Sequence, residues 1–329
     1  MKKRASQYWV LVFSAFVTPA SAFAASADIA KDYPDRPIRV IVPNAPGSSV
    51  DTLNRIMMSP LGNVLGQPLV SDNRAGAGGV IGMEIAKAAL PDGYTLISAS
   101  TAASTIAVLL QKKPTYDPVK DYDHVTQFAV TPNVLIVHPA VPVKSVRELI
   151  DYSKGKPGKF NMASAGAGSQ SHLSGVYLMQ TAKFDSLHVP YKGGGPSVAA
   201  VVAGESQWSL TPAPAVMTLV KAGRLRALGH SLPKRSSLLG DMPTIAETIP
   251  GFDYSGWQGI MVPKGTPKPI VEKLRLAIIR TANMPEVKEQ VAAQGTEVVT
   301  GTSQEFTKVV RDSMVQNAVV VKAVGLTAE

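Results

Sequence analysis

Hydrophobic and polar positions change their period along the chain, and the change predicts strands that are followed by helices. Residues 160–164 alternate as in a short strand, whereas the hydrophobic residues of 173–177 recur at helical spacing. The turn between them holds two glycines, and Ser169 or Ser171 can cap the helix, whose first N–H groups point back into the turn. This turn is either an anion cradle or an ordinary connection that needs glycine.

The same arrangement occurs earlier in the chain. Residues 38–43 form a β-branched run that is typical of a buried parallel strand. The turn 44–49 follows, and residues 50–57 then carry hydrophobic side chains at helical spacing, with Ser48 or Ser49 as the cap. We therefore expect two strand, small-residue turn and capped helix units.

Strand and helix patterns alternate over the rest of the chain. Further strands are expected at 68–70, 94–98, 133–137, 187–191, 225–229 and 259–262. Further helices are expected at 80–90, 145–153 and 197–203, from 266, from 285 to a stop at 295, and from 302. Such alternation predicts parallel α/β sheets, with a first lobe at 28–128, a second lobe at 129–250 and a return to the first lobe at 251–329.

The beginning of the chain is typical of a secretory signal. Three basic residues at 2–4 precede an apolar run at 8–17, and two A-x-A sites follow, at 22–24 and 25–27. The apolar run is too short to span a bilayer permanently. We therefore expect residues 1–27 to be removed by cleavage near 24–27, which leaves an exported, soluble protein.

Composition and charge narrow the class of ligand. Loss of residues 1–27 removes three cations and no acid, so the formal net charge of +9 falls to +6. Aromatic residues make up 6% of the chain and no basic cluster is interleaved with them, which argues against nucleic acid as a partner. The modest surplus of positive charge favours small anions.

Four polar, almost uncharged loops follow the predicted strands, at 44–49, 98–103, 164–169 and 191–195. Ligands of open α/β sheets bind beyond the carboxyl ends of the strands, so these loops should meet at one site. The two capped helix starts could hold two carboxylates, or one carboxylate and a polar tail. A small organic acid held between two lobes is the resulting hypothesis.

Two larger side chains accompany these loops. His172 lies in the first helical turn, where the dipole opposes positive charge, so we expect it to be neutral and to donate one N–H. Either it contacts the ligand or it packs as a structural histidine. Tyr191 either closes over the ligand or fills the lobe, and the glycines that follow it favour contact.

Patterns that would indicate catalysis or a cofactor fail on their spacing. A G-x-S-x-G elbow is missing, the five histidines lack metal-ligand spacing, and the chain has no cysteine. Gly76-x-Gly78 is followed by Ile81 where a dinucleotide fingerprint needs glycine. We therefore expect no catalytic residue, metal or cofactor. A serine hydrolase that uses Ser169 with His172 is the weaker alternative, because no acid to orient the histidine is evident.

Eight segments in order carry a resemblance to a known family. They are Pro43–Asp51, Asp72–Gly79, Pro91–Leu96, Tyr116–Asp121, Ala163–Leu173, His188–Gly193, Ala222–Leu228 and Val262–Pro267. Together they resemble the receptors of tripartite tricarboxylate transporters, also called the Bug family of periplasmic substrate-binding proteins. They cover nearly the whole chain after the signal.

The resemblance implies a two-lobed type II periplasmic binding protein, with a mostly parallel sheet flanked by helices in each lobe and a ligand cleft between the lobes. It implies a periplasmic, non-enzymatic receptor for small carboxylates whose partners are two membrane subunits of a secondary transporter. We expect a monomer. The candidate ligand-binding residues are Asn44, Ala45, Gly47, Ser48, Ser49, Thr101, Ser164, Ala165, Gly166, Gly168, Ser169, His172 and Tyr191.

Departures from the family pattern leave the ligand open. The family usually has an aromatic residue at the position of Asn44 and a second glycine at that of Ser48, so specificity cannot be copied from a relative. Asn317 stands where the last helix often carries tryptophan. A ligand-responsive sensor partner without a role in transport fits the same sequence.

Overall fold

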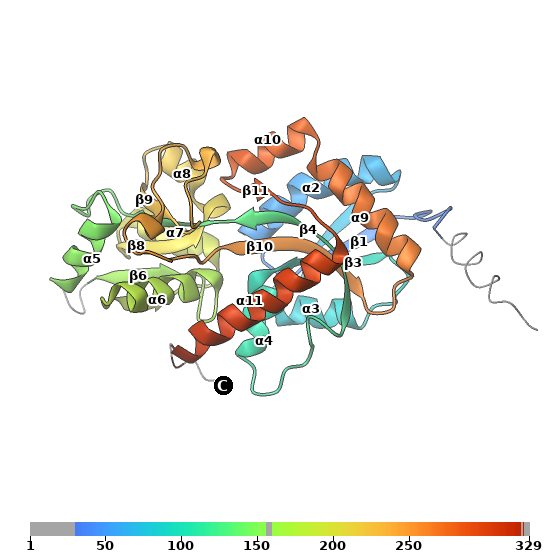
Figure 1. The fold of residues 1–329 in the computed structure, drawn as a ribbon, viewed down its shortest axis with the longest axis horizontal. Coiled ribbons are helices and arrows are strands. Elements are labelled where there is room, and N and C mark those ends of the chain that lie inside the picture. The colour runs from blue at the N-terminus through green and yellow to red at the C-terminus, as the bar shows by residue number, and fades with distance from the viewer. Residues whose placement is uncertain (1–29, 156–159, 324, 326–329) are drawn as a thin grey trace, which may run out of the picture.

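The β-branched runs of the sequence form two sheets, which lie side by side in the computed structural model (Figure 1). The structure describes residues 30–155, 160–323 and 325. The expected signal segment 1–27 lies outside the described residues. Within the described part of the chain, no helix combines the length and the apolar character that a membrane span requires.

The first lobe is built on a six-stranded sheet in the order β11-β4-β10-β3-β1-β2. Its strands are β1 (Ile38–Val42), β2 (Leu69–Asn73), β3 (Thr95–Ser100), β4 (Tyr122–Thr131), β10 (Gly256–Pro263) and β11 (Glu297–Val298). Strands β1, β2 and β3 are parallel, whereas β10 runs antiparallel to both β3 and β4. The sheet is therefore mixed, because a strand that returns from the second lobe is inserted between two strands of the opposite direction.

The second lobe is built on a five-stranded sheet in the order β7-β6-β8-β5-β9. Its strands are β5 (Asn133–Val137), β6 (Asn161–Ser164), β7 (Leu187–Pro190), β8 (Trp208–Pro212) and β9 (Arg226–His230). Strands β6, β7 and β8 are parallel, and β5 pairs antiparallel with β8 and β9. The two-lobed α/β fold is thus as expected, with sheets that are mixed.

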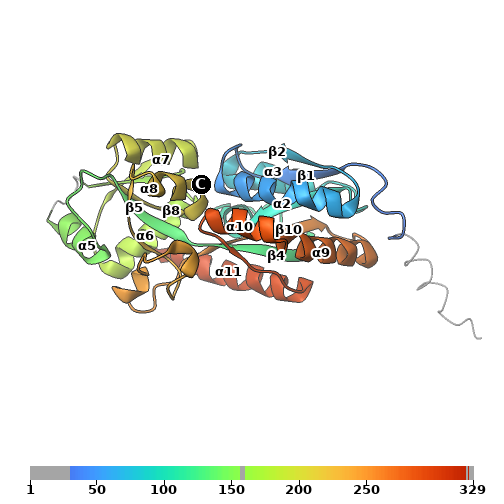
Figure 2. The same cartoon turned by 90° about the horizontal axis from the view of Figure 1, so that it is seen from above.

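Helices cover both faces of each sheet (Figures 1 and 2). In the first lobe, α2 (Ser49–Leu65), α9 (Lys268–Ala282) and α10 (Pro285–Ala293) share one hydrophobic cluster, and α3 (Val80–Lys87) and α11 (Ser303–Ala323) share another on the opposite face. In the second lobe, α5 (Val146–Lys154) and α6 (Gln170–Ala182) cover one face, and α7 (Gly194–Ala203) and α8 (Met217–Lys221) cover the other. A π-helix (Ala102–Ile106) and α4 (Ala107–Leu109) follow β3.

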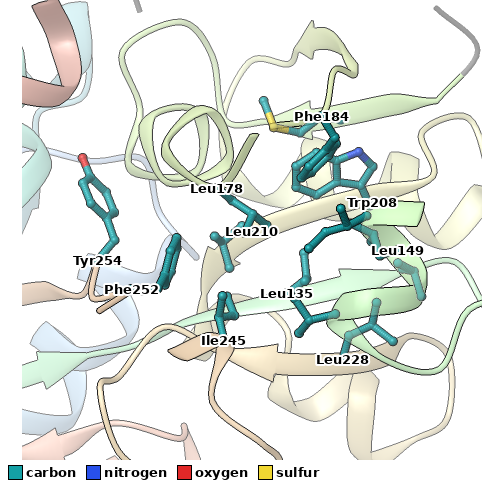
Figure 3. Close-up of a cluster of buried hydrophobic side chains, with 14 of the residues drawn as sticks. Leu135, Leu149, Leu178, Phe184, Trp208, Leu210, Leu228, Ile245, Phe252 and Tyr254 are labelled. Atoms are coloured by element: carbon teal, nitrogen blue, oxygen red, sulfur yellow. The ribbon is translucent and has the colours of Figure 1, made fainter. Parts of the chain in front are cut away.

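Aromatic side chains fill the core of the second lobe. Trp208 of β8 and Phe160, which directly precedes β6, stack with ring centroids 6.3 Å apart, and both side chains are buried. Figure 3 shows Trp208 and Phe184 packed against one another, beside leucines that come from β5 and β8. Burial of about 25 cal/mol per Å² of apolar surface makes such clusters the main source of stability.

The chain enters and leaves the second sheet at one place. The backbone N–H of Asn133 donates to Ser231 Oγ at 2.8 Å, and the N–H of Ser231 donates to the carbonyl of Asn133 at 2.9 Å. Just before this point β4 ends at Thr131, which is paired in register with Gly256, the first residue of β10. Two neighbouring strands therefore carry the chain between the lobes.

Helix α11 is a third connection between the lobes. Its first turns pack on the first sheet, and Val320 and Val321 near its end belong to the core of the second lobe. Asn317 is buried there: its Oδ1 accepts a hydrogen bond from the Tyr254 hydroxyl at 2.6 Å, and its Nδ2 donates to Thr105 Oγ1 at 3.1 Å. This asparagine ties α11 to the returning chain and to the π-helix through hydrogen bonds rather than through an aromatic ring.

Candidate functional site

A cavity of about 160 Å³ lies between the lobes. Seven of the residues expected at the site line it, namely Asn44, Gly47, Ser48, Ser49, Thr101, Ala165 and Ser169. Six others do not line it, namely Ala45, Ser164, Gly166, Gly168, His172 and Tyr191. The small-residue turns of the two lobes thus face the same cavity.

The start of α2 forms the first-lobe wall. Ser48 is extended, with φ −70° and ψ 163°, and its Oγ accepts the N–H of Asp51 at 3.3 Å. The Asp51 carboxylate accepts the N–H of Gly47 and the Arg55 Nε–H, both at 2.9 Å. Burial alone would raise the pKa of Asp51, but these hydrogen bonds hold it below its ordinary value. The N–H groups of Ser49 and Val50 have no partner within the described residues.

The start of α6 forms the second-lobe wall with nearly the same geometry. Ser169 has φ −72° and ψ 162°, and its Oγ accepts the N–H of His172 at 3.2 Å. In the described part of the chain, the N–H groups of Gln170 and Ser171 have no partner. Each lobe therefore presents a serine cap and two free N–H groups, in which the positive end of a helix dipole is concentrated.

The turn before α6 uses its own N–H groups internally. Ala165 donates to Ser171 Oγ at 2.9 Å, Gly166 donates to Ser164 Oγ at 3.2 Å, and Gly168 donates to His172 Nδ1 at 3.0 Å. The glycines serve the fold of this turn: Gly168 has φ +72°, and a Cβ added to it would lie 2.1 Å from Leu110 Cδ1 of the first lobe. The groups left for an anion are those at the helix start.

His172 is part of the support for the turn. Its Nδ1 accepts a hydrogen bond, so the expected donor role falls to Nε2 of the neutral ring. Burial, together with the neighbouring His188, lowers its pKa to about 4, and the two rings stack at 3.9 Å. His188 Nε2 in turn lies 2.6 Å from Ser164 Oγ. These contacts stabilise the conformation of the turn from outside the cavity lining.

Tyr191 lies against the second-lobe core, where it packs on the hydrophobic cluster that contains Val198 and Val201. Its hydroxyl lies 3.2 Å from Ser206 Oγ. Of the two interpretations of Tyr191, this position corresponds to a residue that fills the lobe.

The sequence did not predict several of the lining residues, because they come from the start of a strand and not from its carboxyl end. β10 runs antiparallel to β3, with Gln258 in register with Ser100, so its first residues lie at the same sheet edge as the carboxyl end of β3. Gln258 Nε2 donates to the carbonyl of Val50 at 2.8 Å and to Ser98 Oγ at 2.9 Å, which fixes the start of α2 on the sheet. The additional lining residues are Val50, Ser100, Ala102, Thr131, Gln170, Ser171, Gly194, Gly195, Thr211, Pro212, Ala215, Gly256, Trp257 and Gln258.

The cavity is lined by uncharged residues, both polar and apolar. All of its lining residues are uncharged, so hydrogen bonds and helix dipoles provide the field for a bound anion. The serine hydrolase alternative lacks its hydrogen bond, because Ser169 Oγ pairs with the backbone N–H of His172 and with Ser171 Oγ at 3.2 Å. Within the described residues, no three histidine, aspartate or glutamate side chains form a group that could hold a metal ion.

Comparison with known proteins identifies the family. The family model of tripartite tricarboxylate transporter receptors matches residues 53–326. The chain belongs to this receptor family. The resemblance drawn from the eight sequence segments is thereby confirmed, and so is the expectation of a solute-binding receptor rather than an enzyme.

The relatives of this receptor extend over nearly its full length. It is 35% identical to protein BugT of Bordetella pertussis over 309 residues, which are 93% of this chain and 94% of BugT. A structure described as a periplasmic transporter has a TM-score of 0.86 at 37% identity and covers 90% of this chain and 100% of its own. Rpa4515 of Rhodopseudomonas palustris, solved with adipate, has a TM-score of 0.85 at 30% identity and covers 89% of this chain and 99% of its own.

A third solved relative of the receptor carries another acid. MatC from Rhodopseudomonas palustris, with bound malate, has a TM-score of 0.81 at 30% identity and covers 88% of this chain and 100% of its own. The two-lobed fold is therefore shared with binding proteins whose structures hold small carboxylates.

Proposed function

We propose that this receptor captures a small organic acid in the periplasm, between its two lobes, and delivers it to the membrane subunits of a tripartite tricarboxylate transporter. One observation carries the proposal: two helices from different lobes begin at the same cavity with the same serine cap and the same free N–H groups. An anion bound at both helix starts would receive hydrogen bonds from each lobe and so favour their approach.

The size and neutrality of the cavity support an acid of few atoms. A cavity of 150 Å³ in another protein accommodates benzene, so about 160 Å³ suits a ligand of roughly that size or a slightly larger chain. Desolvating a carboxylate in such a space requires compensating donors, which the N–H groups of Ser49, Val50, Gln170 and Ser171 supply. The adipate and malate of the two solved relatives belong to this class of ligand.

Delivery to a transporter rests on membership of the family, and export rests on the signal expected at residues 1–27. Direct interaction is tested by co-purification of the receptor with the membrane subunits encoded by the same genome. Uptake of the acid that depends on both receptor and subunits supports transport. Ligand-dependent capture by a membrane sensor, without uptake, favours the sensor alternative instead.

Binding itself is tested by thermal unfolding of the protein from residue 28 onward, after it has been unfolded and refolded to remove ligand that co-purifies. The panel holds aliphatic dicarboxylates, hydroxy acids, acidic amino acids and aromatic acids. A ligand at about 100 times its dissociation constant adds roughly 2.7 kcal/mol to the stability of the folded protein. A well-folded sample that responds to none of these acids contradicts the proposal.

A further inference from the structure

Gln170, the first residue of α6, holds a side chain without a partner at the cavity. It lines the cavity and is 9% exposed, and neither its Oε1 nor its Nε2 finds a hydrogen-bond partner within the described residues. Buried amides are nearly always hydrogen-bonded, so an orphan of this kind points to a partner that is not part of the chain.

Gly256 lies beside this amide and has no side chain to cover it. A Cβ at Gly256 would lie 3.7 Å from Gln170 Nε2, 3.7 Å from Thr101 Oγ1 and 3.6 Å from the carbonyl oxygen of Thr131. All four residues line the cavity, and they come from α6, the residue just after β3, the end of β4 and the start of β10. Polar groups of both lobes therefore surround the face of Gly256 that a side chain would otherwise cover.

Thr101 adds a hydroxyl hydrogen that is free to donate to a bound group. Its Oγ1 accepts the N–H of Trp257 at 2.8 Å, and within the described chain its hydroxyl hydrogen has no acceptor. Two further lining residues have an orphan atom, Asn44 at Oδ1 and Trp257 at Nε1. The cavity thus combines unpaired acceptors with unpaired donors, and none of its lining side chains is charged.

The Gln170 amide discriminates between a charged and an uncharged partner. A carboxylate can accept from Nε2, but it leaves Oε1 unpaired and close to a negative oxygen. A carboxamide or a hydroxyl both donates and accepts, so it can satisfy both atoms of the amide. When a ligand lacks the group that pairs with a buried polar side chain, that side chain is left without a partner, so the site binds such a ligand much more weakly.

We propose that Gln170 is a specificity-determining residue, and that the ligand is an acid with an uncharged donor–acceptor group, a carboxamide or a hydroxyl, at a distance from its carboxylate. The inference rests on the proposed function, because the carboxylate is taken to occupy the helix starts. The uncharged group then lies over Gly256, between Gln170 and Thr101.

Four acids of matched length test the proposal by calorimetry. Succinamate and 4-hydroxybutyrate carry the uncharged group, succinate carries a second carboxylate, and butyrate carries a methyl group. The wild-type protein should bind the first two at least tenfold more tightly than either of the others. Gln170→Met keeps the length of the side chain in a good helix former and should reduce this preference over butyrate below threefold.

Gln304→Met is the matched control, because Gln304 is exposed in the first turn of α11, away from the cavity. It should leave the order of the four acids unchanged. Unliganded Gln170→Met should unfold at the temperature of the wild type or higher, because the substitution removes an unpaired polar group.

Three outcomes overturn the inference. The first is that the wild-type protein binds succinate more tightly than succinamate. The second is that Gln170→Met loses the same factor of affinity for all four acids. The third is that this variant is less stable than the wild type without ligand. Each of them leaves the receptor proposal intact as long as acids bind. A folded wild-type protein that binds none of the four also overturns the inference, whereas the receptor proposal fails only if the whole panel of acids gives no thermal shift, so the two failures are distinguishable.

Discussion

The two capping serines act on both stability and recognition. Ser48 and Ser169 each satisfy one N–H of the helix that they cap, and each leaves two N–H groups free at the cavity. An N-cap serine contributes about 1 kcal/mol to the stability of a protein. A cap far from the cavity would show the stability effect alone.

Ser169→Ala and Ser145→Ala form such a matched pair. Ser145 caps α5 and accepts the N–H of Glu148 at 3.2 Å, which is the distance found at Ser169, but it does not line the cavity. Both variants should lose about 1 kcal/mol of unfolding free energy in urea titrations. Ser169→Ala alone should also weaken acid binding by about 1–3 kcal/mol in calorimetry. Equal affinity in the two variants would reduce Ser169 to a cap.

His172 makes the protein sensitive to acid. Because burial lowers its pKa from 6.5 to about 4, the unfolded chain binds more protons between these values, and stability falls as the pH is lowered through this window. Above pH 6.5 the contribution is complete. The loss is at most about 1.4 kcal/mol per pH unit for this one group.

His172→Asn tests the origin of this sensitivity. The asparagine Oδ1 can replace Nδ1 as the acceptor of the Gly168 N–H, but it does not titrate. Urea midpoints measured from pH 7 to 4.5 should therefore fall less steeply in the variant than in the wild type. Parallel curves would show that folding does not lower the pKa of His172.

The sequence predicted residues whose role depends on their neighbours along the chain. It did not predict residues that come together only when the chain folds. Ser48 and Ser169 were each predicted as one of two possible caps, because a cap depends on its immediate neighbours. Gln170 directly follows the predicted residue Ser169. The importance of its unpaired amide depends on Gly256, which lies beside it in β10, the strand that returns from the second lobe. Gly168 was predicted as a ligand-binding residue, whereas the structure shows that a Cβ there would meet Leu110 of the other lobe.

At the scale of elements, α3 fixes the first-lobe turn through close contact of backbones. A Cβ at Gly82 of α3 would lie 2.8 Å from Pro43 Cα and 3.0 Å from the carbonyl oxygen of Arg74. Since the obstacles are backbone atoms, the helix itself would have to move. Pro43 directly precedes Asn44, which lines the cavity.

Gly82→Ala should consequently cost about 1–3 kcal/mol of stability, as overpacking does in protein cores. It should also weaken acid binding, because the turn at Asn44 is displaced. Gly155→Ala is the control: Gly155 has φ −77°, and its nearest neighbour is a carbonyl oxygen at 3.6 Å, so this variant should be neutral or slightly more stable. Chemical denaturation and calorimetry of both variants measure the difference.

The period of the hydrophobic residues predicted most helices and strands. The elements that it did not predict were missed for physical reasons. The strand β5 was predicted with the bounds that the structure has, because it is a continuous buried apolar run. β4 was missed, since Asp123, His124 and Gln127 interrupt its hydrophobic pattern. Their partners are Lys264 just after β10, Thr307 of α11 and the carbonyl of Ala129 in β4 itself. The mixed direction of the sheets depends on which strand the chain returns beside, and no local pattern encodes that.

At the scale of the whole molecule, the position of the cavity predicts a change of shape. An acid held by both helix starts favours the closed arrangement of the lobes, so the radius of gyration in small-angle scattering should decrease at saturation. The probe is the acid that gives the largest thermal shift in the panel. A variant that no longer binds this acid, measured at the same acid concentration, is the control. Unchanged dimensions in the saturated wild type would contradict binding by closure.

The neighbouring points at which the chain enters and leaves the second sheet make that lobe an insertion into a β-hairpin. Thr131 and Gly256 are paired, and Asn133 and Ser231 are bonded just beyond them, so the coding segment for 132–255 begins and ends at one place in space. The cavity wall of the second lobe, with Ser169 and Gln170, is encoded entirely within that segment. A single exchange of genetic material between two receptors can therefore replace one wall of the cavity and keep the other.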